Sequence, residues 1–183
     1  YIALERCKTA REAIQCMTDL VAEYGYASSG ETFSIADPNE VWLMELIGKG
    51  KVEKGAVWVA TRIPDDCIAA HANQARVTTI NFKDKDNWMW SKDVVSFARK
   101  QGYFEGKDKD FNFQEAYAPY DFSGLYVCEA RVWSFFRQFS DDMDKYFDFA
   151  SGKTFVETGG KYAGERMPLY IKPNHKVSAQ ELK

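Results

Sequence analysis

The clearest periodic pattern in the chain lies near its N-terminus and predicts an amphipathic helix. Thr9 and Glu12 have the spacing of a capping box, in which each side chain bonds the other residue's backbone N–H. Gly25 stands where a C-terminal cap is expected. We therefore expect a helix over residues 10–24 with one buried stripe. The apolar positions of that stripe are Ala10, Ala13, Ile14, Met17, Leu20, Val21 and Tyr24.

The pattern then changes to short apolar runs bounded by turn residues, which predict β-strands. The connections are a DPNE turn, a lysine-rich loop and an IPDD turn, and strands joined in this way favour an antiparallel sheet. The run from Val41 to Ile47 is too continuously apolar for a sheet with one wet face. We therefore expect both faces to be covered, by helices and by another sheet. The predicted strands are TFSIAD at 32–37, EVWLMELI at 40–47, AVWVATR at 56–62 and CIAAHA at 67–72.

Helical patterns return from Asn87 onward. Ser91 can cap a helix that ends at Gly102, whereas the segment 103–119 has no clear period and is predicted to be a long surface loop. With the sheet, these helices make an α+β fold, which we expect to be a single domain over residues 1–183. The segment 141–173 predicts no definite element. A further helix is expected over 123–139, with an apolar face of Leu125, Cys128, Val132, Phe135, Phe136 and Phe139.

Composition and charge narrow the classes of function. With 183 residues, 45% hydrophobic and 28% charged, the chain can enclose a core. Its net charge is −3 and its lysines are scattered, so nucleic-acid binding is not expected. No apolar run has the length of a membrane span. Four widely spaced cysteines without a CxxC motif, and only two histidines, predict reduced thiols and no metal site.

The two ends of the sequence predict that the chain is an internal fragment of a longer protein. It begins at Tyr1, without a methionine. Ser178 and Glu181 have capping-box spacing and predict the start of a helix, yet the chain stops at Lys183. The compartment, cytoplasm or cell envelope, is left open by the sequence.

The stretch CIAAHANQARV, residues 67–77, carries the strongest candidate for chemistry. It begins as a buried strand and continues into Asn73, Gln74 and Arg76, without a glycine or proline to mark an ordinary turn. An asparagine at the end of a strand can aim its amide NH₂ at a developing oxyanion, and such a donor lowers a barrier by about 3 kcal/mol. Alternatively, Asn73 caps the strand or bonds its own backbone. The sequence contains no Gly-rich phosphate loop, nucleophile elbow or HExxH motif.

Four segments of the chain together resemble the dipeptidases of peptidase family C69, also called U34. The resemblance is dense from about Thr9 to Phe82 and looser over 83–119 and 141–166. The set of segments is far more specific than any one of them. The four segments are TAREAIQCMTDLVAEYGYASSGETFSIADPNEVWLMELIGKG, GAVWVATRIPDDCIAAHANQARV, YDFSGLYVCEARVWSFFRQF and PLYIKPNHKVSAQEL.

The resemblance implies a cysteine peptidase of the N-terminal nucleophile hydrolase type, with an αββα layered fold. In such enzymes the thiol of an N-terminal cysteine attacks the substrate carbonyl and its own α-amino group is the base, without metal or organic cofactor. The implied substrates are dipeptides. Tyr1 cannot be this nucleophile, and Cys7 lies inside the chain. We therefore expect the nucleophile upstream of Tyr1, in a missing N-terminal part of the protein, and no activity from this chain alone.

The resemblance also suggests roles for individual residues. In the distantly similar choloylglycine hydrolases and penicillin V acylases, a strand pair ends in an asparagine of the oxyanion hole, which points to Asn73. The same relatives have a later arginine near the nucleophile, and Arg131 in EARVW is the candidate. Gln74 and Arg76 either contact the substrate or brace the loop. His71 is interpreted as a structural histidine.

Two other functions stay open from the sequence. One is a binding or regulatory member of the fold without a nucleophile, and the other is an amidase or acylase that acts on amides other than peptides. The presence or absence of a processed cysteine upstream separates the first from a dipeptidase, and substrate profiling separates the second. The sequence determines neither the dipeptide specificity nor the oligomeric state. A homo-oligomer is one of the states that stay open.

Overall fold

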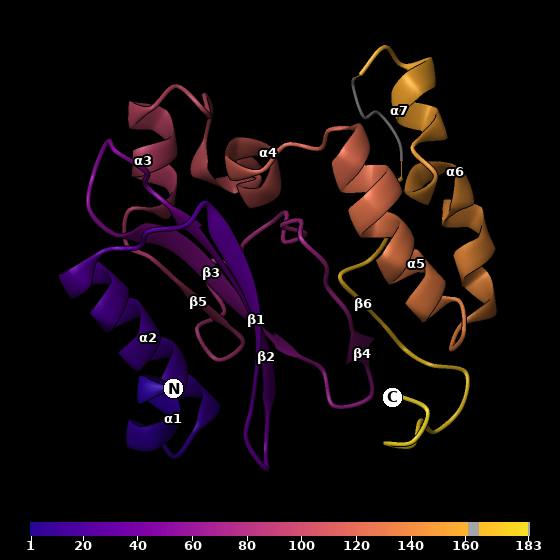
Figure 1. Ribbon diagram of the computed structural model, residues 1–183, viewed down its shortest axis with the longest axis horizontal. Helices are drawn as coiled ribbons and strands as arrows, with labels where there is room; N and C mark the ends of the chain where they lie inside the picture. The colour runs from indigo at the N-terminus through magenta and orange to yellow at the C-terminus, as the bar shows by residue number, and fades with distance from the viewer. Residues whose placement is uncertain (161–164, 183) are drawn as a thin grey trace. The chain divides into compact units, whose positions relative to one another are not determined.

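The computed structural model describes residues 1–160 and 165–182 and has an α+β architecture (Figure 1). Its internal contacts divide the chain into two compact units. The first comprises Tyr1–Asp65 and Val77–Ala118, and the second comprises Asp66–Arg76 and Pro119–Lys183. Each unit has a hydrophobic cluster of its own. A single domain over residues 1–183 stays a prediction.

A four-stranded antiparallel sheet forms the centre of the first unit, as predicted (Figure 1). The turn between its first two strands is set by Asp37, whose Oδ1 accepts the N–H groups of Asn39 and Glu40 at 2.7 and 3.0 Å. In order across the sheet, the strands are β1 (Gly30–Ala36), β2 (Val41–Gly48), β3 (Ala56–Ile63) and β5 (Trp88–Trp90).

The predicted fourth strand exists but is shorter than expected, and its predicted place in the main sheet is wrong. Of residues 67–72, only β4 (Ile68–Ala69) is extended in a ladder, and it pairs with β6 (Tyr170–Ile171) in a two-stranded sheet of the second unit. The fourth place in the main sheet belongs to β5, in a region where the sequence predicts helices. The alternation of apolar residues shows that a segment can be a strand, but it does not identify a partner far along the chain.

Helix α2 (Ala10–Tyr24) covers one face of the main sheet. Its capping box at Thr9 and Glu12 is formed as predicted, and Gly25 ends it with a φ of 96°, a conformation that favours glycine. Most of the predicted stripe is buried or half-buried, but Tyr24, the last residue of the helix, is exposed. The cluster between helix and sheet consists of Ala10, Ile14, Trp42, Met44, Leu46 and Ala60.

The opposite face of the sheet is also buried. Val57 and Val59, which alternate with the residues facing α2, are fully buried, and α3 (Val94–Lys100) packs against β3. The prediction that helices cover the sheet is confirmed, whereas a second sheet as a further layer stays a prediction. The first unit also contains the short helix α1 (Ile2–Arg6), a 3₁₀ turn at Asp108–Asp110 and α4 (Phe113–Tyr117).

Two predictions for this region are wrong. Helix α3 begins at Val94, and the Ser91 side chain does not cap it, because Ser91 Oγ accepts the Trp58 N–H at 3.2 Å. The segment 103–119 is not simply a surface loop, since Phe111 and Phe113 are buried in the core. Aromatic residues without a helical or strand period can still be core when they come from several short elements, as they do here.

The second unit is built around the helix predicted at 123–139. It consists of a π-helical turn, Gly124–Glu129, followed by α5 (Ala130–Phe136), and the predicted apolar face packs into the core. Around it lie a 3₁₀ segment (Asp141–Tyr146), α6 (Phe147–Ala150) and α7 (Lys153–Glu157). The buried cluster of this unit consists of Leu125, Val132, Phe136, Phe139, Met143, Tyr146, Phe149, Met167 and Ile171.

The helix predicted to start at Ser178 is not formed within the described residues. Glu181 Oε2 accepts the Ser178 N–H at 2.8 Å, which is one half of the capping box, but the segment up to Leu182 is a turn. Lys183 lies outside the described residues. Across residues 1–160 and 165–182, no helix combines the length and the apolar character that crossing a bilayer would require.

Candidate functional site

The structure brings together the two residues to which the sequence assigns catalytic roles. Asn73 lies four positions after β4, and Arg131 lies on the first turn of α5. Arg131 Nη2 donates a hydrogen bond to Asn73 Oδ1 at 2.8 Å, across 58 positions of the chain. Both side chains are exposed, so the contact is open to solvent. The segment that carries Asn73 is irregular, not the strand end that the sequence predicts.

This hydrogen bond determines the direction in which the Asn73 amide faces. An asparagine side chain has an acceptor oxygen on one side and a donor NH₂ on the other. Because the guanidinium holds Oδ1, the NH₂ group is turned away from Arg131, and it donates to none of the described residues. Arg131 is itself fixed by a second bond, from Nε to the Val127 carbonyl at 2.8 Å. The pair therefore presents an oriented and available N–H donor.

Beside this exposed pair lies a buried ion pair that holds the same segments together. Arg76 Nε donates to Glu129 Oε1 at 2.9 Å, with side chains only 2% and 1% exposed. The other nitrogens of Arg76 donate to main-chain carbonyls of Ala70, Pro168 and Leu169 at 3.0 to 3.2 Å. Of the two roles considered for Arg76, these contacts account for bracing the loop, and substrate contact stays a prediction.

Glu129 is a buried residue of this region that the sequence does not single out as a candidate. Burial raises the pKa of its carboxyl group, and Arg76 partly offsets this effect. A signal for it was present in the sequence. Glu129 stands four residues after Leu125 and three before Val132, which places a carboxylate within the predicted apolar face. A charge at such a position predicts a buried partner, because an unpaired carboxylate in a core is costly.

Gln74 lies against the start of the π-helical turn. Its Oε1 would be 2.7 Å from a Cβ added at Gly124, so glycine at this position allows the close approach. The Gly124 N–H donates to Asp121 Oδ1 at 2.6 Å. His71 is half-buried. Contact of Gln74 with a substrate stays a prediction.

Cys7 and Cys67 do not have the surroundings of an activated nucleophile. All four cysteines of the chain are free thiols. Burial, with the neighbouring Cys16, raises the pKa of Cys7, and burial with Asp66 raises the pKa of Cys67. A nucleophilic cysteine needs the opposite shift, because the thiolate is the reactive form. In the described part of the chain, no group of three or more His, Cys, Asp or Glu residues is arranged to hold a metal ion.

Comparison with known proteins shows which family this chain is similar to. The sequence model of peptidase family C69 matches residues 1–183. A probable dipeptidase of Latilactobacillus sakei is 33% identical over 132 residues, which cover 72% of this chain and 26% of that protein. A probable dipeptidase of Salmonella dublin is 29% identical over 184 residues, covering 100% of this chain and 37% of that protein.

A dipeptidase of Bifidobacterium longum is 26% identical over 189 residues, covering 100% of this chain and 33% of the relative. The chain thus spans between about a quarter and somewhat more than a third of the length of these relatives. The match of the family model along the whole sequence establishes that this chain belongs to peptidase family C69.

Proposed function

We propose that this chain is part of a cysteine-type dipeptidase and supplies one wall of its active site. In this proposal, Asn73 is the oxyanion donor, Arg131 orients it, and the nucleophilic cysteine belongs to a part of the protein outside residues 1–183. Family membership supports the reaction class, and the relatives named above are described as dipeptidases or probable dipeptidases. The single observation that supports the residue roles is the hydrogen bond from Arg131 to Asn73.

The proposed reaction has two stages. First, the cysteine thiol transfers its proton to the α-amino group of the same residue while sulfur bonds to the substrate carbonyl carbon. The carbonyl oxygen becomes an oxyanion, which accepts a hydrogen bond from Asn73 Nδ2. Collapse of this intermediate breaks the C–N bond and releases the C-terminal amino acid, which takes up the proton. In the second stage water hydrolyses the thioester and regenerates the thiol.

Arg131 contributes to this step through the amide of Asn73. Its positive charge at Oδ1 draws electron density from the amide and strengthens Nδ2 as a donor. It also prevents the amide from turning its oxygen toward the oxyanion. In that orientation the partially negative amide oxygen would repel the negatively charged oxyanion. A donor fixed before the reaction loses no energy to reorganisation when charge develops.

The test is Asn73→Ala in the longer protein that contains this chain. We expect kcat for dipeptide hydrolysis to fall about 10²–10³-fold, the usual loss for one oxyanion donor. The melting temperature should stay unchanged, since the Asn73 side chain is exposed. Asn39→Ala, which removes another exposed asparagine, is the matched control and should keep full activity.

Unchanged kcat in Asn73→Ala would refute the assignment of Asn73. The location of the nucleophile is tested separately, by assaying residues 1–183 alone against a panel of dipeptides. No turnover is expected, and clear turnover would refute the proposal that the nucleophile lies elsewhere. Activity of the longer protein on non-peptide amides, without dipeptide hydrolysis, would instead identify an amidase.

A further inference from the structure

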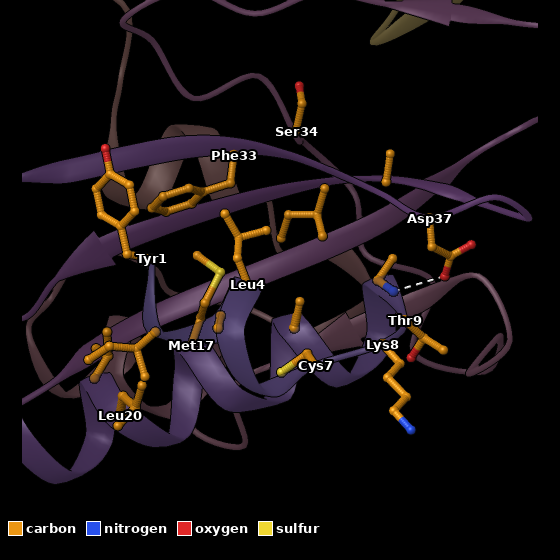
Figure 2. Close-up of a pocket in the computed structure, with 17 residues that line it drawn as sticks. Tyr1, Leu4, Cys7, Lys8, Thr9, Met17, Leu20, Phe33, Ser34 and Asp37 are labelled. Atoms are coloured by element: carbon orange, nitrogen blue, oxygen red, sulfur yellow. Dashed lines mark hydrogen bonds between the residues drawn. The ribbon is translucent and has the colours of Figure 1, made fainter.

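The two outer edges of the main sheet, β1 and β5, lie next to different hollows. Beside β1, a hollow of about 800 Å³ opens between α1, α2 and the strand (Figure 2). Leu4, Met17 and Phe33 are among the apolar side chains that line it, and at one end Asp37 Oδ2 accepts the Ala10 N–H at 2.8 Å. Nothing in the structure identifies an occupant for this hollow, whereas the groove beside β5 has features that do.

The groove beside β5 has a volume of about 630 Å³ and lies between α2, the β2–β3 loop and the strand. The Asn73 and Arg131 pair does not line it. An inference about this groove therefore does not depend on the proposed reaction.

The edge of β5 presents backbone groups that another strand could bond. On its inner side, the Arg62 N–H donates to the Asn87 carbonyl at 2.9 Å, and the Ser91 N–H donates to the Trp58 carbonyl at 3.0 Å. Backbone groups alternate in direction along an antiparallel strand. Those of Trp88 and Trp90 must therefore point outward, away from β3, and both residues line the groove.

The inner wall of the groove is apolar. Trp58 and Met89 are half-buried there and pack against the cluster beneath α2, and Ala22 of α2 lines the facing side. Side chains of a bound strand alternate between the two faces of the sheet. Every second residue of such a strand would therefore lie toward α2, where an apolar side chain is favoured.

The rim of the groove is positively charged although the whole chain has a net charge of −3. Lys54, Lys85 and Lys92 line it and are exposed, and none of them forms an ion pair with a described residue. Lys49 differs, because it is only 8% exposed and pairs with Glu53 at 2.8 Å and Asp93 at 2.5 Å.

The lining contains four lysines and two carboxylates. Asp93 is paired with Lys49, and Asp19 accepts a hydrogen bond from the neutral amide of Gln15 at 2.7 Å. Because the lysines outnumber the carboxylates, the net charge of the lining is positive, which favours a partner with carboxylates.

We propose that the β5 edge binds an extended acidic peptide segment as an additional strand of the main sheet. Its backbone would pair with the outward groups of Trp88 and Trp90, its apolar side chains would lie toward α2, and its carboxylates would meet the three exposed lysines. Strand addition of this kind takes affinity from backbone hydrogen bonds and specificity from alternating side chains.

The probe is the peptide acetyl-Glu-Val-Glu-Val-Glu-Val-Glu-amide, titrated into residues 1–183. Tryptophan fluorescence reports the binding, because Trp58, Trp88 and Trp90 line the groove, and calorimetry confirms the stoichiometry. One-to-one saturable binding that weakens with added salt is expected. Absence of saturable binding would overturn the proposal and leave the lysines as a device that keeps other strands from pairing with this edge.

Two double substitutions test whether the lysines of the groove contribute to binding. The double substitution Lys85→Glu/Lys92→Glu should weaken binding by about tenfold or more, about 0.7 kcal/mol for each reversed charge. The same charge change at Lys107→Glu/Lys109→Glu, two exposed lysines outside the groove, should leave it almost unchanged. Equal loss in both would mean that binding follows net charge alone and would overturn the proposal.

Methylation of the peptide nitrogens tests strand pairing. Methyl groups on the three valine nitrogens remove donors from one side of the strand, and methyl groups on the nitrogens of the second, third and fourth glutamates remove donors from the other. Because only one side can face β5, one methylated form should lose binding and the other should keep it. Loss in both forms, or in neither, would overturn the strand-addition geometry.

Discussion

Two hydrogen-bonded contacts join the same two segments of the second unit, residues 66–76 and 124–136, in opposite environments. The pair of Arg76 and Glu129 is almost fully buried, and that of Asn73 and Arg131 is exposed. In the buried pair, all three nitrogens of the Arg76 guanidinium donate to oxygen atoms of the protein. In the exposed pair, the amide NH₂ has no partner among the described residues. The buried contact is therefore suited to holding the segments, and the exposed one to acting on a ligand.

The difference follows from the cost of removing charge from water. Two ions in a dry site must satisfy each other, and removing one of them leaves the other unpaired. An exposed pair loses little when it is broken, because water replaces the partner. The comparison predicts that substitutions at the two contacts should separate stability from activity.

The largest effect is expected at Glu129. Glu129→Ala leaves the Arg76 guanidinium buried without its carboxylate, and the free energy of unfolding should fall by about 3–5 kcal/mol. Urea denaturation followed by circular dichroism measures it. Glu129→Gln keeps an acceptor oxygen for Arg76 and should lose less. A loss below about 1 kcal/mol in Glu129→Ala would mean that the pair does not hold the segments, contrary to the comparison.

A smaller effect on stability is expected at the exposed contact. Arg131→Ala removes the bonds to Asn73 and Val127, but the free energy of unfolding should change by less than about 1 kcal/mol. Arg137→Ala is the control, since Arg137 is exposed on the following turn and stacks on Trp133 at 4.6 Å. If Arg131→Ala were as destabilising as Glu129→Ala, the distinction between a holding contact and an acting contact would fail.

The smallest effect is expected on the titration of an exposed carboxylate, Glu181, which contrasts with the buried carboxylate of Glu129. Hydrogen bonds from the Ser178 side chain and backbone, with His175, lower the pKa of Glu181 to about 2, whereas burial raises the pKa of Glu129. Stabilisation of this turn by Glu181 is thus present above its ordinary pKa of 4.5 and is lost as the pH falls through about 2. An NMR titration of the Glu181 carboxyl carbon measures the midpoint. Ser178→Ala should move it upward, and an unmoved midpoint would contradict the role of the hydroxyl.

The sequence was sufficient where structure depends on neighbours along the chain. The ends of α2 follow from Thr9, Glu12 and Gly25, and the β1–β2 turn follows from Asp37 and its proline. These signals lie within four residues of the feature that they determine, so no knowledge of the rest of the fold is needed.

The remaining features depend on partners far along the chain. The pairing of β4 with β6, the use of Ser91 by Trp58 and the burial of Glu129 against Arg76 all join segments that local periodicity treats separately. The candidate site divides in the same way. Asn73 and Arg131 were predicted from the distant resemblance to choloylglycine hydrolases and penicillin V acylases, but the hydrogen bond between them, and the orientation that it gives the amide, required the structure.

The main-chain acceptors of Arg76 have a consequence for the tolerance of this region to substitution. Arg76 binds the carbonyl oxygens of Ala70, Pro168 and Leu169, and every residue type has such an oxygen. The side chains at those three positions can therefore change without removing the contact. Arginine at position 76 has no equivalent, because lysine offers a single point of charge in place of a planar fork of donors. In a library of variants, position 76 should accept almost no replacement while the residues that it binds vary.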